Sequence, residues 1–182
     1  MSNGEVVRLN GSADALAHGV VLVPEDRKAQ GLILSQTIGE NLALGNYPRV
    51  APSGWITSGR TQVFAQRGIT RLLIKGTADQ SVGTLSGGNQ QKVVIAKSIP
   101  REPKVVILDE PTRGIDVGAR AAIYEIVAEL ARGGMAVIVV SSDLDEVLGL
   151  SHRVMVLSRG ANRGVLEREK AGRVAVMERA TS

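Results

Sequence analysis

The strongest constraint on the fold is the continuous apolar run from Val105 to Leu108, which Asp109, Glu110 and Pro111 follow directly. A run without polar residues predicts a parallel strand that is buried on both faces. Because Pro111 ends strand pairing, both acids are expected at the carboxyl edge of the sheet, where open α/β sheets bind ligands. Their side chains point to opposite faces, so one can serve a metal ion. A solvated acidic loop is the alternative interpretation.

A second motif, Leu85 to Asn89 (LSGGN), lies upstream of this strand. Two glycines let the backbone approach a ligand closely, and the helix predicted after them would present unpaired N–H groups. The Ser86 hydroxyl can then donate to a phosphate oxygen. The simpler interpretation is a serine that caps a helix, followed by glycines in a turn.

Hydrophobic periodicity predicts alternating strands and helices after position 100, which indicates βαβ units and a mostly parallel sheet. The stretch 31–99 shows no convincing strand and is predicted to form an inserted helical subdomain, with the core α/β part at 100–168. Thr37 and Glu40 have the spacing of a capping box. The predicted strands are 20–23, 105–108, 135–140 and 153–157; the predicted helices are 37–44, 60–74, 89–99, 119–131 and 143–150. We expect a loop at 46–59 and a turn and polar tail after position 160.

Composition excludes several classes of protein. With 43% hydrophobic and 22% charged residues in 182, the chain can bury one core and is not disordered. It has no cysteine, so disulfides and thiolate metal sites are excluded. The net charge of +4 is modest and the basic residues are spread along the chain, so the charge permits a nucleic acid or an anionic membrane surface as partner but argues for neither. We expect no nucleic-acid partner.

The motifs together resemble the ATP-binding subunits of ABC transporters. The residues that carry this resemblance are Leu85 to Lys92 (LSGGNQQK) and Ile107 to Gly118 (ILDEPTRGIDVG). Pro24 to Lys28 (PEDRK) and Val140 to Leu144 (VSSDL) point more narrowly to the second nucleotide-binding domain of bacterial simple-sugar importers, the ribose, galactose and xylose group. The resemblance implies a P-loop NTPase-like fold with ATP and Mg²⁺ as ligands.

The resemblance also implies a role for each matching residue. Leu85, Ser86, Gly87, Gly88 and Asn89 match the signature loop, which contacts the γ-phosphate of an ATP held by another nucleotide-binding domain. Asp109 matches the Walker B aspartate that helps to hold Mg²⁺ through water, and Glu110 matches the general base that polarises the attacking water. Asp116 matches the aspartate at the seam between domains. Glu25 and Ser142 occupy positions where most members carry glutamine and a switch histidine.

These two replacements suggest a weak catalytic site, because serine replaces histidine poorly at a γ-phosphate and Glu25 adds negative charge nearby. The chain also contains no Gly-x-x-x-x-Gly-Lys-Ser/Thr loop. We therefore expect a domain whose N-terminal part, with the Walker A strand, is missing. Since that strand is expected beside the Walker B strand, Val105–Leu108 should have an unpaired edge.

The resemblance implies an ATP-hydrolysing component of a carbohydrate importer at the cytoplasmic face of the inner membrane. Its expected partners are another nucleotide-binding domain and membrane permease subunits, without direct sugar binding. Two alternatives stay open. An inactive fragment would only supply its signature loop to a partner. A DNA-repair ATPase of the SMC type shares the motifs, but the chain lacks the long heptad insertion of that class.

Overall fold

The structure, a computed structural model, describes residues 7–181, and its contacts divide the chain into two units. The first unit ends at Ile138 and the second begins at Val139. The predicted boundaries of the helical subdomain (31–99) and the core α/β part (100–168) differ from this division, and they stay predictions. In the described part of the chain, no helix combines the length and the apolar character needed to cross a membrane.

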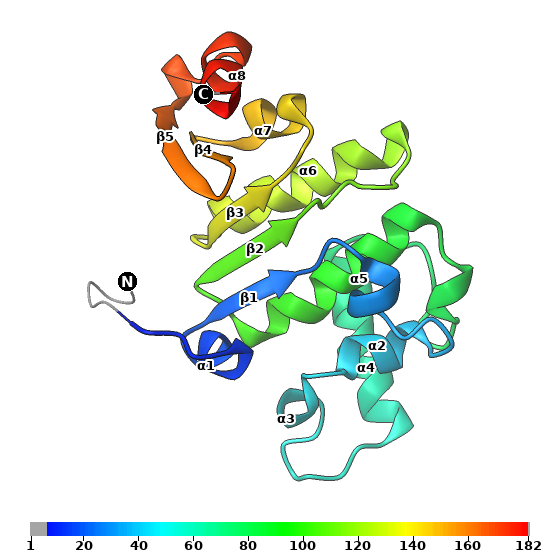
Figure 1. The fold of residues 1–182 in the computed structure, drawn as a ribbon. Helices are drawn as coiled ribbons and strands as arrows, with labels where there is room; N and C mark the ends of the chain where they lie inside the picture. Colours follow the sequence, from blue (N-terminus) through cyan, green and yellow to red (C-terminus); the bar gives the residue numbers. More distant parts are fainter. Residues whose placement is uncertain (1–6, 182) are drawn as a thin grey trace. The chain divides into compact units, whose positions relative to one another are not determined.

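A three-stranded sheet forms the centre of the first unit (Figure 1). Strand β1 (Val20–Val23) pairs in parallel with β2 (Val105–Asp109), and β3 (Ala136–Val140) follows on the other side of β2. The expectation of an unpaired edge on Val105–Leu108 is therefore wrong. Strand order depends on the crossover connections, which local periodicity does not reveal. Within residues 7–181, β2 is the central strand, and β1 and β3 are the two edge strands of this sheet.

The two faces of this sheet differ in burial. The register places Val21 beside Val106 and Val23 beside Leu108, and all four side chains are buried. On the opposite face Leu22 is 56% exposed. The expectation that the Val105–Leu108 strand is buried on both faces is thus correct for one face only: Val106 and Leu108 are buried, whereas Val105 and Ile107 on the opposite face are partly exposed.

Two long helices supply much of the apolar core of this unit. Helix α5 (Gly87–Ser98) packs against β1, and α6 (Val117–Arg132) packs against α5. The apolar stripe predicted for α6 is confirmed, since its buried residues are Ile123, Ile126, Val127 and Leu130. The short helix α1 (Ser12–Ala17), which periodicity did not predict, packs against β1.

The segment between β1 and β2 is helical. Thr37 caps α2 (Ile38–Ala43) in a complete capping box with Glu40, as predicted. Helix α4 (Ser58–Arg71) packs against α2 and α5 and continues through Gly68 without a break. The predicted loop at 46–59 instead contains the short helix α3 (Tyr47–Val50). Short helical turns also occur at Arg27–Gly31, Val82–Thr84, Ile99–Arg101 and Arg168–Lys170.

The second unit is built on a β-hairpin. Strand β4 (Arg153–Ser158) pairs antiparallel with β5 (Ala161–Glu167), flanked by α7 (Leu144–Leu150) and α8 (Arg173–Thr181). Its small core consists of Val154, Val156, Leu166 and Val176. The sequence predicts β4 and α7 correctly but not β5 or α8. The segment after position 160 is rich in glycine and charged residues, which are typical of a turn and a polar tail.

Candidate functional site

The acidic tip of β2 leads into the loop 110–116, called here the β2–α6 loop. Asp109 is the last residue of the strand and Glu110 follows it; both are half-buried. Glu110 has φ +45°, a left-handed conformation that costs a non-glycine residue about 1 kcal/mol or more. Such strained residues cluster at functional sites. The backbone therefore turns sharply between the two carboxylates.

The remainder of the β2–α6 loop is firmly held. The Arg113 amide donates to the Glu110 carbonyl at 3.0 Å, and the Ile115 amide donates to the Thr112 carbonyl at 3.1 Å. Gly114 has φ +65°, which glycine adopts without strain. Asp116 caps α6, because its Oδ1 accepts from the Ala119 amide at 2.9 Å.

The signature loop (residues 85–89) opens helix α5. Leu85 is buried, while Ser86 is exposed at the N-cap position and its side chain makes no capping hydrogen bond. Instead, Ser86 Oγ accepts from Asn89 Nδ2 at 3.0 Å, and Asn89 Oδ1 accepts from the Lys75 amide at 2.8 Å. The simple capping interpretation of Ser86 is therefore not supported. The N–H groups of the first turn of α5 have no intrahelical partner, as at every helix start.

The two loops lie against each other. A Cβ at Gly88 would be 2.8 Å from the Ala119 Cβ, and a Cβ at Gly87 would be 3.1 Å from the Gly114 carbonyl oxygen. A Cβ at Gly88 would push the signature loop away from the start of α6, and a Cβ at Gly87 would press on the Gly114 carbonyl. The structure thus brings together two motifs that the sequence separates by about twenty residues, and both glycines are needed for this contact.

The segment after β1 connects to the same place. Glu25 forms an ion pair with Arg113, so its charge is partly balanced by the β2–α6 loop. Arg27 donates to the backbone carbonyls of Arg113 and Gly114 and to the side chain of Gln90. Neither Arg27 nor Gln90 was predicted as a site residue. One signal in the sequence could have identified them. The segments 20–23 and 105–108 are both predicted as strands of one parallel sheet, so the residues that follow them are expected to meet at the same edge.

Ser142 belongs to the second unit, where it is exposed in the turn between β3 and α7. Its neighbour Asp143 caps α7 through bonds from the amides of Asp145 and Glu146. On helix α5, burial lowers the pKa of Lys92, and the positive charge of Lys75 lowers this pKa further.

The acidic residues suit Mg²⁺ only with help from other ligands. Within residues 7–181, no group of three or more histidine, cysteine, aspartate or glutamate side chains is arranged to hold a metal ion. Mg²⁺ usually keeps several waters and binds one or two carboxylates together with substrate phosphates. Asp109 fits such a water-mediated role, and the signature loop fits phosphate oxygens.

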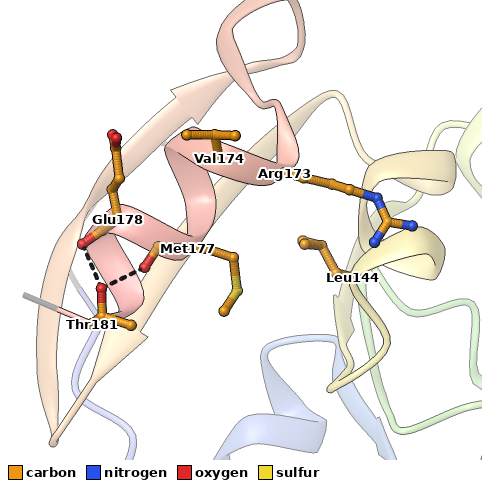
Figure 2. A pocket seen from close by; sticks show the side chains of 6 residues that line it. All are labelled: Leu144, Arg173, Val174, Met177, Glu178 and Thr181. Carbon is orange, nitrogen blue, oxygen red and sulfur yellow. Dashed lines mark hydrogen bonds between the residues drawn. The ribbon is translucent and has the colours of Figure 1, made fainter.

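A shallow pocket in the second unit contains none of the predicted site residues. It lies between α7 and α8 (Figure 2), where Leu144 and Met177 provide apolar surface. Its lining residues are Leu144, Arg173, Val174, Met177, Glu178 and Thr181. Arg173 forms an ion pair with Asp145 beside it.

Comparison with known proteins identifies relatives of this chain. The chain is 45% identical over 181 residues to a ribose/galactose/methyl galactoside import ATP-binding protein of Rhizobium etli, covering 98% of this chain and 34% of the relative. It is 44% identical over 180 residues to the ribose import ATP-binding protein RbsA of Halalkalibacterium halodurans, covering 98% of this chain and 36% of that protein. The chain thus spans about a third of the length of these curated relatives.

The fold and the sequence pattern give the same classification. A dimeric ATP-binding cassette in a post-hydrolysis state, bound to ADP and Pi, superimposes with a TM-score of 0.70 at 21% identity, covering 88% of this chain and 68% of the other. This likeness shows the P-loop NTPase-like α/β fold. The sequence pattern described as ABC transporter matches residues 2–113. The chain therefore belongs to the ABC transporter family.

Proposed function

We propose that this chain is part of the ATP-hydrolysing component of an ABC-type carbohydrate importer. Its signature loop, Leu85 to Asn89, completes a nucleotide site whose phosphate cradle is held by another nucleotide-binding domain. The relatives at about 45% identity are named as import ATP-binding proteins for ribose and galactose, which supports this substrate class.

The observation that carries this proposal is the contact between the signature loop and the β2–α6 loop. Ser86, whose hydroxyl is not used for capping, and Asp116 are exposed residues that lie next to the contacting residues of the two loops. A partner domain that contacts one loop therefore contacts the other. If Ser86 and Asp116 were only two independent helix caps, glycine would not be needed at both position 87 and position 88.

The remaining site residues divide into metal-binding and proton-transfer roles. Asp109 would hold Mg²⁺ through water, and Glu110 would accept a proton from the attacking water. Bound Mg²⁺ would neutralise charge on the phosphate oxygens. Glu25 would lie at the edge of this site, with its charge balanced by Arg113. Ser142 takes the place of the switch histidine and is proposed to contribute less to hydrolysis than a histidine would.

We further propose that the component acts at the cytoplasmic face of the inner membrane with permease subunits, and that it binds neither sugar nor nucleic acid itself. An inactive segment that only supplies Ser86 to Asn89 in trans is the second candidate. The absence of a Gly-x-x-x-x-Gly-Lys-Ser/Thr loop from the 182 residues favours that candidate for the chain alone.

The test is Ser86→Arg in the full-length ATPase that carries this segment, assembled with its permease. A bulky cation on the signature loop blocks close approach to phosphate, so ATP turnover should fall roughly tenfold or more. Ser58→Arg is the matched control, because Ser58 is also an exposed serine at a helix start but belongs to α4. Wild-type turnover in Ser86→Arg would show that the loop takes no part in hydrolysis.

A second variant separates the two candidates. Glu110→Gln removes the proposed general base and leaves the signature loop unchanged. If this segment only supplies its loop in trans, Glu110→Gln retains full turnover while Ser86→Arg does not. If its own site also hydrolyses ATP, both variants lower turnover.

A further inference from the structure

Arg27 connects three segments that are far apart in the sequence. Its Nε donates to Gln90 Oε1 at 3.3 Å, its Nη1 donates to the Arg113 carbonyl at 2.9 Å, and its Nη2 donates to the Gly114 carbonyl at 3.3 Å. One guanidinium thus links the segment after β1, the β2–α6 loop and the signature helix α5.

Each acceptor is itself fixed in position. Gln90 is only 5% exposed, and its Nε2 donates to the Val82 carbonyl at 3.3 Å, which sets the direction of its Oε1. The carbonyls of Arg113 and Gly114 belong to a loop that its own backbone hydrogen bonds hold. Arg27 therefore joins two preformed elements and does not shape either of them alone.

The guanidinium of Arg27 also accounts for the presence of glycine at position 87 of the signature loop. A Cβ at Gly87 would lie 2.7 Å from Arg27 Nη2, closer than its distance of 3.1 Å from the Gly114 carbonyl oxygen. The space above Gly87 is occupied by Arg27. A methyl group at Gly87 would therefore displace the end of the Arg27 side chain.

We propose that Arg27 is a positioning residue that holds the signature loop and the β2–α6 loop at a fixed separation. The role rests on the proposed function, in which both loops meet the nucleotide of a partner domain. With the loops linked, Ser86 and Asp116 approach that nucleotide as one rigid surface. Without the link, each loop must be ordered separately when the domains associate.

Lysine cannot replace arginine here. The three acceptors lie around a planar fork whose donors point in fixed directions, whereas lysine carries one compact ammonium at the end of a flexible chain. Arg27→Lys keeps the charge and loses the geometry. It therefore distinguishes positioning from a simple electrostatic effect.

The experiment uses the full-length ATPase with its permease, and compares Arg27→Lys and Arg27→Gln with the control Lys28→Gln. Lys28 is the exposed next residue on the same turn, so the control removes one positive charge from the same segment. Both Arg27 variants should lower kcat by roughly tenfold to a hundredfold, because misplacement of about an ångström has this effect on rates. The KM for ATP should change much less, and Lys28→Gln should match the wild type.

Hydrogen exchange supplies a readout that does not depend on catalysis. Backbone amides at 113–115 and 87–90 should exchange faster in Arg27→Lys and Arg27→Gln than in the wild type or Lys28→Gln. If the Arg27 variants do not fold, Gly87→Ala takes their place, since its methyl group displaces the guanidinium and leaves every charge present. It should show the same faster exchange and lower kcat.

Three outcomes are decisive. Lower kcat and faster exchange in the Arg27 variants, with Lys28→Gln unchanged, support the positioning role. Wild-type kcat and exchange in both Arg27 variants, while Ser86→Arg is inactive, overturn that role and leave the proposed function in place. Wild-type turnover in Ser86→Arg overturns the proposed function, and with it the role of Arg27 in hydrolysis.

Discussion

Glu25 and Arg113 form an ion pair that joins the segment after β1 to the loop after β2. Their side chains are 40% and 67% exposed, so water screens the attraction between them. The pair therefore directs the Arg113 side chain more than it stabilises the fold. It also balances part of the negative charge of Glu25.

We predict that Glu25→Gln changes the free energy of unfolding of the chain by less than about 1 kcal/mol, as is typical of exposed ion pairs. Urea unfolding at low and high salt measures this change. Glu102→Gln is the matched control, because Glu102 forms an exposed 3.2 Å ion pair with Arg49. A loss of several kcal/mol in Glu25→Gln alone would mean that the pair supports the loop far more than its exposure indicates.

A second prediction concerns the purified chain without a partner. It should show no Mg²⁺-dependent ATPase activity above background, because its 182 residues contain no phosphate-binding Gly-x-x-x-x-Gly-Lys-Ser/Thr loop. A coupled assay for released phosphate is the measurement, with Glu110→Gln as the control for contaminating enzymes. Turnover that is present in the wild type and absent in Glu110→Gln would refute the prediction.

A third prediction follows from the outer strand of the sheet. In the described residues no strand pairs with the free side of β3, and Ile138 on this strand is 48% exposed. Apolar edge strands promote association between chains, and lysine on such an edge opposes it. Ile138→Lys should weaken self-association of the isolated chain roughly tenfold, equivalent to about 1.4 kcal/mol.

Sedimentation velocity over a concentration series measures that association. Val117→Lys is the control, since Val117 is 82% exposed at the start of α6 and not on the strand edge. A wild-type chain that stays monomeric throughout the series and melts cooperatively at high temperature would contradict the expected association.

A fourth prediction concerns pH. Hydrogen bonds from the Thr37 amide and hydroxyl lower the pKa of Glu40, in that order of importance. A lowered folded-state pKa means that the carboxylate stabilises the fold at neutral pH, and that this contribution is lost as the pH falls through the lowered pKa. Glu40→Gln should therefore lower the melting temperature at neutral pH and approach the wild type in acid.

Melting curves from neutral pH down to about pH 3, below the ordinary pKa of a glutamate, test this prediction. Glu125→Gln, an exposed change on α6, is the control. The same difference between Glu40→Gln and the wild type at every pH would show that the capping box does not favour the charged form of Glu40.

Local signals predicted local structure well. The capping box of Thr37 and Glu40 and the buried stripe on α6 follow from spacing alone, because the partners lie within a few turns of one helix. Strand order and strand burial were not predictable in this way. The residues of β2 do not determine which strands pair with it, because pairing depends on segments far away in the sequence. The apolar sequence of β3 likewise does not show how far its two faces are buried.

The candidate site shows the same limit. The motifs that resemble a known family could be identified in the sequence, but the link between them could not. Arg27 bonds to residues more than sixty positions away, and in the sequence it is one charge in a polar loop. The contact of Gly88 with Ala119 was equally hidden, since both residues are small and neither carries a functional group.

That contact has an electrostatic consequence. Because Gly88 and Ala119 both lie in the first turn of their helices, the N-termini of α5 and α6 approach each other closely. Each helix macrodipole is equivalent to roughly half a positive charge at this end. Asp116 offsets part of the potential at α6, whereas no acidic residue lies in the first turn of α5. The positive end of the helix dipole is therefore offset less by acidic groups beside Ser86 than beside Asp116.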